Sequence, residues 1–319
     1  MSDFKPLLSI AIPTWNRGEI LKIALSRLLP QIGNYNQLIE IVISDNGSTD
    51  DTQQVISSEF ANYGNINKIL FKQEVNKGFY GNFKKLISLC NGKYIWILSD
   101  DDYIFDDVLP MILNSLQDSN YDLGALFLSD WTNNASDDEP LSFHAYNQDG
   151  FFKQGNFRHT LISSIIFLNN INENDEIFNV LDQNALIAYP VFVKAVKDSK
   201  QFGVIYGNSL ITAKDDNVRF NALSIFTKDL EKCMIYIDKY LPRSIINFIT
   251  NSFLSTLIEK HYRDFKYEGL YKDNHESFLK RFAFYLKYKN FYKHIIPIKL
   301  LPSKLYWPMR KGLKYLAKK

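Results

Sequence analysis

The sequence of 319 residues contains only two cysteines, Cys90 and Cys233. They are too few and too far apart for a zinc knuckle or a disulfide framework, so we expect a reducing compartment. No stretch approaches the roughly 18 uninterrupted apolar residues of a membrane-spanning helix, and the first residues do not resemble a signal peptide. The 46% hydrophobic and 23% charged residues exclude global disorder and collagen-like repeats. These values predict a soluble or peripheral globular protein with one large domain or two modest ones.

Acidic residues are absent from the last part of the chain. From Ser277 to Lys319 there are 12 Lys or Arg and no Asp or Glu, which leaves 25 basic and 35 acidic residues, a net charge of −10, before it. A basic segment of this kind favours an anionic partner, either a membrane surface or a nucleic acid. No recognised nucleic-acid-binding fold accompanies it, so we expect no nucleic acid.

Residues 291–319 interleave Lys and Arg with bulky apolar and aromatic residues, which is typical of segments at an anionic membrane surface. Pro297, Pro302 and Pro308 predict short interfacial segments instead of one long helix. The alternative is a C-terminal region that packs on the rest of the protein and leaves a solvated basic face.

Short apolar runs alternate with amphipathic stretches over the first 130 residues, which predicts a mostly parallel sheet with helices on both faces. The expected strands are 7–12, 38–44, 68–73, 94–98 and 123–128, and the expected helices are 19–29, one ending at 60, 79–90 and 105–116. Further on we expect a loop at 132–150, strands at 161–167 and 203–206, and a helix at 185–196. From about residue 225 the pattern is helical. The sequence thus predicts an α/β domain over 1–220 and a smaller helical region over 221–319.

Polar clusters follow three of these strands, where an open α/β sheet binds its ligands. Asp100, Asp101 and Asp102 come directly after an apolar strand, and adjacent carboxylates repel unless a cation lies between them. A hard divalent cation, Mg²⁺ or Mn²⁺, fits oxygen ligands best. The alternative is a solvated acidic loop before the next helix. Asp45 either accepts a hydrogen bond from a base or sugar hydroxyl, or is a turn residue in Asp-Asn-Gly-Ser.

Four segments, taken together, indicate a protein family more specifically than any one of them does. They are Ser9–Arg17, Ile41–Asp50, Asn76–Gly78 and Ile97–Asp102. In residues, order and spacing they resemble glycosyltransferase family 2, strongly over about residues 6–130, weakly to about 220 and not beyond. The similarity is to the bacterial surface-polysaccharide branch, with abequosyl- and rhamnosyltransferase-like members. It implies a GT-A fold, a nucleotide-sugar donor, inversion at the anomeric carbon and a saccharide or lipid-linked saccharide acceptor. With the reducing compartment and the basic C-terminal segment inferred above, we expect a cytoplasmic enzyme that lies peripherally on the inner face of the plasma membrane.

The resemblance also implies roles for particular residues. The nucleotide sugar would bind to Pro13, Thr14, Asn16, Arg17, Asp45, Asn46, Asn76, Gly78, Asp100 and Asp101. The metal, Mn²⁺ or Mg²⁺, would bind to Asp102 and Asp100. Many members read Asp-x-Asp-Asp where this chain reads Ser-Asp-Asp-Asp, so the main ligand is Asp101 or Asp102. We favour Asp102, with Asp100 towards the ribose.

The general base is not marked by a Glu-Asp pair after the three aspartates. Asp182 is our first candidate, and Asp130 and then Asp215–Asp216 are reserves. Asp182 also suits the cap of the following helix. His159 is a lone histidine for which we expect a structural role.

Other classes of protein fit less well. The chain has neither G-x-G-x-x-G nor G-x-x-x-x-G-K-[ST], which excludes common dinucleotide and P-loop sites. A sugar-nucleotide pyrophosphorylase would have a Gly-rich, Arg-containing loop where this chain has Pro13 to Gly18. A catalytically silent GT-A-like module that binds a saccharide or serves as a scaffold is the non-enzymatic alternative.

Overall fold

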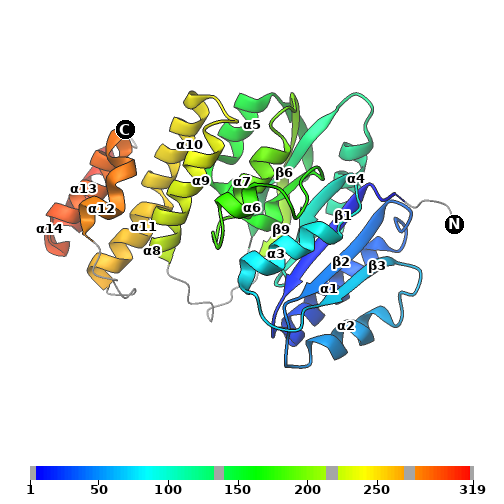
Figure 1. Cartoon of the computed structure of the whole chain (residues 1–319). Coiled ribbons are helices and arrows are strands. Elements are labelled where there is room, and N and C mark those ends of the chain that lie inside the picture. Colours follow the sequence, from blue (N-terminus) through cyan, green and yellow to red (C-terminus); the bar gives the residue numbers. More distant parts are fainter. Residues whose placement is uncertain (1–4, 133–139, 213–221, 269–276, 317–319) are drawn as a thin grey trace. The chain divides into compact units, whose positions relative to one another are not determined.

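The computed structural model describes residues 5–132, 140–212, 222–268 and 277–316. The chain divides into two compact units, residues 1–218 and 219–319 (Figure 1). The predicted division between residues 220 and 221 falls outside the described residues.

The first unit is built on one nine-stranded mixed sheet, in the order β3-β2-β1-β4-β8-β6-β9-β5, with β7 paired to β9. Its strands are β1 Leu8–Thr14, β2 Ile39–Asp45, β3 Asn67–Lys72, β4 Tyr94–Ile97, β5 Asp102–Ile104, β6 Leu123–Thr132, β7 Ser142–Tyr146, β8 Ile165–Leu168 and β9 Gln201–Thr212. Strands β1 to β4 pair in parallel, as do β6 and β9. The remaining pairs are antiparallel. The predicted mostly parallel α/β architecture is therefore confirmed.

Helices cover the sheet, and their sequences explain why they form there (Figure 1). They are α1 Gly18–Ile32, α2 Thr52–Phe60, α3 Gly78–Leu89, α4 Val108–Gln117, α5 Gln148–Gly155, α6 Ile177–Val180 and α7 Ala188–Ala195. In α1, Leu21, Leu25, Leu28 and Ile32 recur at helical spacing and are all buried. Every residue of β2 is buried, as expected for a parallel strand that is covered on both faces.

Three predictions for the middle of the chain were wrong in detail. The expected loop at 132–150 contains β7, and α5 begins within it at Gln148. The side chains of β7 are exposed or half-buried, so the segment lacks the apolar alternation of a strand and is held by backbone pairing to β9. The strand expected at 161–167 begins only at Ile165, after a 3₁₀ turn, and β9 is much longer than 203–206.

The second unit is helical. Its helices are α8 Ala222–Ser224, α9 Leu230–Ile237, α10 Arg243–Ser255, α11 Leu257–Arg263, α12 Phe278–Phe282, α13 Ile296–Leu300 and α14 Ser303–Leu316. The apolar residues Ile245, Ile249, Phe253 and Ile258 are buried in its core. Within the described ranges, we find no helix that combines the length and the apolar character needed to cross a bilayer.

The segment after residue 290 is built into this unit. Glu259 of α11 is buried and accepts a hydrogen bond from the Tyr306 hydroxyl at 3.1 Å, and it pairs with His294 Nδ1 at 2.9 Å. Ile295 and Ile298 are fully buried. As expected from its prolines, the segment forms short pieces, although α14 continues through Pro308.

Candidate active site

A cavity of about 770 Å³ lies where β1, β2 and β4 end, because parallel strands place their carboxyl ends at one edge. Its volume is within the roughly 300–1,000 Å³ of small-molecule sites. It is lined by Pro13, Thr14, Trp15, Asn16, Arg17, Ile20, Asn46, Asn76, Gly78, Phe79, Asn82, Ser99, Asp100 and Ile162. Eight of the residues predicted from the sequence are thus brought together. Asp45, Asp101, Asp102 and Asp182 are not among the lining residues.

Asp100 is buried at the cavity wall and holds two partners. Its Oδ2 accepts a hydrogen bond from Thr14 Oγ1 at 2.7 Å, and its Oδ1 lies 3.0 Å from Arg17 Nη1. Burial raises the pKa of Asp100 to about 6, although the Arg17 charge opposes this. Arg17 Nη2 also pairs with Asp101 Oδ2 at 2.7 Å. One guanidinium therefore bridges two of the three aspartates.

Asp102 begins β5 and points to a partner that the sequence did not suggest. Its Oδ2 accepts a hydrogen bond from Ser163 Oγ at 2.6 Å, and Ser163 Oγ in turn accepts one from the Ser99 backbone N–H at 3.0 Å. Burial raises the pKa of Asp102 to about 7, and the neighbouring charges of Asp101 and Asp100 add to this effect. A buried carboxyl whose pKa is raised in this way, two residues from the cavity-lining Asp100, is a candidate functional group.

The three aspartates suit a hard divalent cation. Within the described residues, no group of three or more His, Cys, Asp or Glu side chains is arranged to hold a metal ion. Mg²⁺ and Mn²⁺ do not need one, since they commonly take one or two carboxylates and complete their shell with substrate phosphates. Two carboxylates already converge on a positive charge, that of Arg17. The carboxylate oxygens of Asp100, Asp101 and Asp102 are therefore donors of the kind that the predicted metal prefers.

Asp45 is placed as a turn residue. It is fully buried, its Oδ1 accepts a hydrogen bond from the Ser48 N–H at 2.9 Å, and its Oδ2 accepts one from Gln53 Nε2 at 2.6 Å. Gly47, with φ of 76°, lets this turn approach Val75, whose carbonyl carbon would lie 2.8 Å from a Cβ at Gly47. The alternative that the sequence left open for Asp45 thus has direct geometric support.

Asn46 organises the floor of the cavity. Its Oδ1 accepts a hydrogen bond from the Lys77 N–H at 2.9 Å, and its Nδ2 donates to Asn76 Oδ1 at 2.9 Å and to the Gly78 carbonyl at 3.1 Å. This explains why the Asn-Lys-Gly turn lies beside the end of β2. Gly78 has φ of 70°, a conformation that favours glycine.

Sequence reasoning missed Asn82, which lies behind this turn on α3. Its Nδ2 donates to the Ser44 carbonyl at 2.9 Å, and its Oδ1 accepts from Ser44 Oγ at 2.7 Å and from Gln73 Nε2 at 3.1 Å. Asn82 therefore fixes the start of α3 against the end of β2. A polar residue one turn into an amphipathic helix was the available signal. The exposed Trp15 and Phe79 on the cavity wall were also missed.

Of the candidates for the general base, Asp182 does not line the cavity, and the side chains of Asp130 and Asp215–Asp216 lie outside the description. Asp182 is exposed, between α6 and α7, and its charge adds to burial in raising the pKa of Tyr80 in the first turn of α3. The backbone of Asp130 pairs with Asn208 of β9, but its side chain lies outside the description, as do Asp215–Asp216.

His159 is buried among the rings of Phe127, Phe151, Phe152 and Phe192, away from the residues that line the cavity. In the part of the chain that the structure describes, neither of its ring nitrogens has a hydrogen-bond partner, and burial lowers its pKa to about 3. It is a packing residue.

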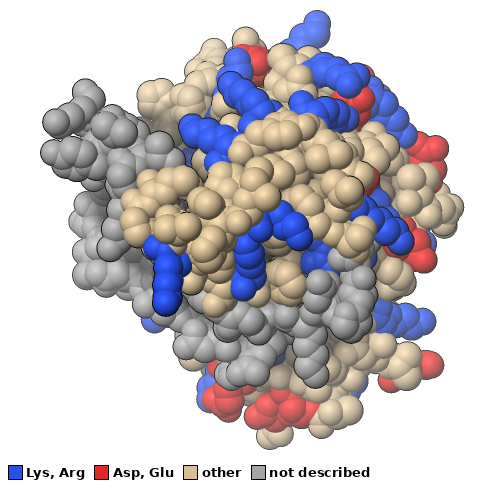
Figure 2. Space-filling model, turned by 90° about the vertical axis from the view of Figure 1, so that its left-hand side faces the viewer, with Lys and Arg blue, Asp and Glu red and all other residues tan. Residues whose placement is uncertain are grey.

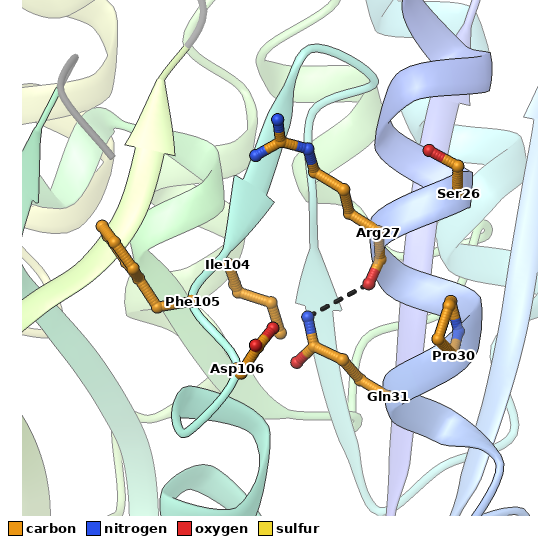
Figure 3. A pocket seen from close by; sticks show the side chains of 7 residues that line it. All are labelled: Ser26, Arg27, Pro30, Gln31, Ile104, Phe105 and Asp106. Carbon is orange, nitrogen blue, oxygen red and sulfur yellow. Dashed lines mark hydrogen bonds between the residues drawn. The ribbon is translucent and has the colours of Figure 1, made fainter. Parts of the chain in front are cut away.

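A second, smaller cavity of about 390 Å³ lies between α1 and residues 104–106 (Figure 3). Arg27 and Gln31 extend from α1 beside it, and Gln31 Nε2 donates to the Arg27 carbonyl at 3.1 Å. The Arg27 guanidinium lies 4.1 Å from the centre of the Tyr103 ring. None of the three consecutive aspartates lines this cavity.

The family model for "Glycosyl transferase family 2" matches residues 9–183, more than half of the chain. The chain belongs to glycosyltransferase family 2. The match begins in β1 and ends just after Asp182, so it includes the predicted nucleotide-sugar and metal residues together with Asp130 and Asp182, but not Asp215–Asp216. This family assignment favours a glycosyltransferase over a sugar-nucleotide pyrophosphorylase.

Two curated relatives each match about a third of the chain. Abequosyltransferase RfbV of Salmonella typhimurium is 42% identical over 120 residues, which are 37% of this chain and 34% of that protein. A Campylobacter jejuni protein named GalNAc(5)-diNAcBac-PP-undecaprenol beta-1,3-glucosyltransferase is 30% identical over 108 residues, 34% of each chain. The chain spans about a third of the length of the curated relatives it matches.

Among solved structures, the mannosyltransferase PcManGT from Pyrobaculum calidifontis, in complex with GDP-Man and Mn²⁺, superposes with a TM-score of 0.54. The match covers 91% of this chain and 83% of that one at 11% sequence identity. This similarity shows a shared fold for the family 2 chain.

Proposed function

We propose that this chain is an inverting, metal-dependent glycosyltransferase that moves a sugar from a nucleoside-diphosphate sugar to a hydroxyl of a saccharide or lipid-linked saccharide in bacterial surface-polysaccharide synthesis. The observation that carries the proposal is the convergence of Asp100, Arg17, Thr14 and Asn46 on one cavity at the carboxyl ends of the sheet. The names of the Salmonella and Campylobacter relatives support sugar transfer, and the Campylobacter name, which contains PP-undecaprenol, supports a lipid-linked saccharide as acceptor.

The residues of the cavity divide the work between the two halves of the donor. Asn46 and the turn at Asn76–Gly78 shape the nucleoside end, and Asp45 positions their loop. Asp100 and Arg17 lie at the diphosphate end. Mn²⁺ or Mg²⁺ would be held there by Asp102 and Asp100 and would offset charge on the leaving diphosphate. The complex of PcManGT with GDP-Man and Mn²⁺ supports this choice of metal.

The acceptor hydroxyl loses its proton to a carboxylate and attacks the anomeric carbon opposite the leaving diphosphate, so that a single displacement inverts configuration. We assign this base to Asp182 and keep Asp130 in reserve. Asp182 is solvent-exposed, so an acceptor can reach it, and it lies near the first turn of α3, where Phe79 lines the cavity.

A binding panel tests the donor. Thermal unfolding is measured with UDP, GDP, dTDP and CDP, each with and without Mn²⁺. A nucleotide at 100 times its Kd stabilises by about 2.7 kcal/mol, and we expect one of the four to do so only with metal. Metal-dependent release of sugar from the matching donor then separates an enzyme from a silent module. Absence of any nucleotide effect would overturn the proposal.

We further propose that the second unit rests on an anionic membrane surface, which would place the enzyme at the inner face of the plasma membrane. Figure 2 shows Lys and Arg interspersed with uncharged residues over the side that carries α12 to α14. We call the exposed large apolar residues and the exposed lysines of residues 279–309 the basic-apolar face. Its exposed apolar members are Leu279, Leu286, Tyr292, Leu300, Leu305, Trp307 and Met309, and its exposed lysines are Lys280, Lys287, Lys289, Lys293, Lys299 and Lys304.

Point substitutions test this face better than truncation. Deleting residues 295–319 would remove Ile295, Ile298 and Tyr306 from the core and take away the Tyr306 hydroxyl that donates to the buried Glu259, so the unit would lose stability. We therefore use the double variant Leu300→Ser and Leu305→Ser, whose side chains are 72% and 59% exposed.

The assay is sedimentation with vesicles that contain anionic lipid, at low and high salt. The double variant should lose most of its binding, and each Lys→Glu change on the face should weaken binding by about 1 kcal/mol or more. Ile235→Ser is the matched control, since Ile235 on α9 is 59% exposed but lies outside the basic-apolar face. Wild-type protein that stays in the supernatant at low salt would refute the membrane proposal without affecting the donor proposal.

A further inference from the structure

Arg17 is the positive charge at the centre of the candidate active site. Its two terminal nitrogens contact different aspartates, Nη1 with Asp100 at 3.0 Å and Nη2 with Asp101 at 2.7 Å. The other oxygens of these carboxylates accept hydrogen bonds from Thr14 Oγ1 and Ser99 Oγ. Arg17 thus neutralises part of the repulsion among three adjacent carboxylates.

The same carboxylates are the residues that would hold a divalent cation, so Arg17 and the metal compete for them. A guanidinium within 3 Å of a carboxylate oxygen occupies a position that a metal ion needs, and two cations on the same oxygens repel each other. Metal binding at Asp100 therefore requires the Arg17 side chain to leave at least one of its partners.

Arg17 is built so that its side chain can move while its backbone stays fixed. Its N–H donates to Thr52 Oγ1 at 3.3 Å, and its carbonyl accepts from the Leu21 N–H at 2.9 Å in the first turn of α1. The side chain lines the cavity and is 23% exposed. A diphosphate that enters the cavity offers the guanidinium a second anionic partner, for which the planar fork of arginine is well suited.

We propose that Arg17 is an exchangeable counter-ion, which pairs with Asp100 and Asp101 in the metal-free enzyme and passes to the diphosphate of the donor when the metal takes its place. This inference rests on the proposed function, because it takes the metal and the nucleoside diphosphate as ligands of the cavity. The exchange makes the nucleotide and the metal bind cooperatively. The diphosphate draws the Arg17 guanidinium away from the carboxylates that the metal needs, and the metal frees the guanidinium for the diphosphate, so the coupling is reciprocal.

The exchange predicts that removing the Arg17 charge changes the affinities for the metal and for the nucleotide in opposite directions. Replacing Arg17 by Gln removes the competitor, so Mn²⁺ alone should bind at least about fivefold more tightly than to the wild type. The same change removes a phosphate contact, so the nucleoside diphosphate should bind about tenfold more weakly at saturating Mn²⁺. A residue that only stabilises the fold would weaken both.

The experiment measures free Mn²⁺ by electron paramagnetic resonance and nucleotide binding by calorimetry. The nucleotide is the one of UDP, GDP, dTDP and CDP that gives the largest thermal shift. Arg17→Gln is compared with Arg17→Lys, which keeps the charge and should bind Mn²⁺ as weakly as the wild type. Arg27→Gln is the matched control, because Arg27 lies on α1 and stacks on Tyr103, beside the second cavity of Figure 3, and it should change neither affinity.

The outcomes separate the two proposals. Tighter Mn²⁺ and weaker nucleotide binding in Arg17→Gln, with no change in Arg27→Gln, support the exchange. Wild-type protein that binds both ligands while Arg17→Gln holds Mn²⁺ no more tightly would overturn the exchange and leave the proposed function intact. Wild-type protein that binds neither ligand would overturn both.

Discussion

Replacing Asp102 by Asn should make the metal-free protein more stable at alkaline pH while it removes metal binding. Asp102 is buried, and burial raises its pKa from an ordinary 3.8 to about 7. Since the folded protein holds this proton more tightly than the unfolded chain, the contribution of the carboxyl is fully present below about pH 4 and is lost as the pH rises through 7. The difference between these two pKa values corresponds to about 4 kcal/mol in the free energy of unfolding, as an order of magnitude.

Asparagine stays neutral at every pH and can still accept the hydrogen bond from Ser163 Oγ. In urea unfolding with a chelator, Asp102→Asn should match the wild type near pH 4 and exceed it by about 2–4 kcal/mol at pH 8. Adding Mn²⁺ with the bound nucleotide at pH 8 should stabilise the wild type only. Asp107→Asn, at an exposed aspartate nearby, serves as the control. Equal or lower stability of Asp102→Asn at pH 8 would refute the reasoning.

Three further changes test other residues. Asp45→Ala should weaken nucleoside-diphosphate binding roughly tenfold to a hundredfold, measured by calorimetry, as its loop loses two hydrogen bonds to the carboxylate; unchanged affinity would leave Asp45 as a turn residue alone. Asp182→Asn should lower kcat strongly with little change in donor affinity, and an active Asp182→Asn beside an inactive Asp130→Asn would move the base to Asp130. Because the pKa of His159 is lowered to about 3, the free energy of unfolding should rise as the pH increases from 3 to 6.5, and His159→Leu should flatten this slope in urea titrations; an unaltered slope would show that other groups cause it.

Local pattern was enough to predict the first half of the sheet. The strand predicted at 38–44 is β2, Ile39–Asp45, because a short segment rich in β-branched residues indicates a buried strand whatever lies next to it. Strand β8 shows the limit. Its apolar run predicts a strand, but its antiparallel direction between β4 and β6 depends on where the chain returns to the sheet.

In the candidate site, too, some contacts could be predicted from the sequence and others could not. Asp100 and Thr14 follow adjacent strands, so parallel pairing alone predicts that they meet, and their side chains are 2.7 Å apart. Ser163 and Asp102 are 61 positions apart and meet through a 3₁₀ turn that no periodicity marks. The pairing of Arg17 with two aspartates depends on rotamers, which a sequence pattern does not contain.

The position of β9 has a consequence for synthesis on the ribosome. This strand is the last of the sheet along the chain, but it lies between β6 and β5 and also pairs with β7. Asp102 pairs with Thr212, the final residue of β9. A nascent chain that has emerged only as far as residue 200 therefore has β5 without its partner and an open edge on β6. Such edges pair readily with other chains. The growing enzyme is therefore most prone to aggregation just before β5, the strand that begins with Asp102, pairs with β9.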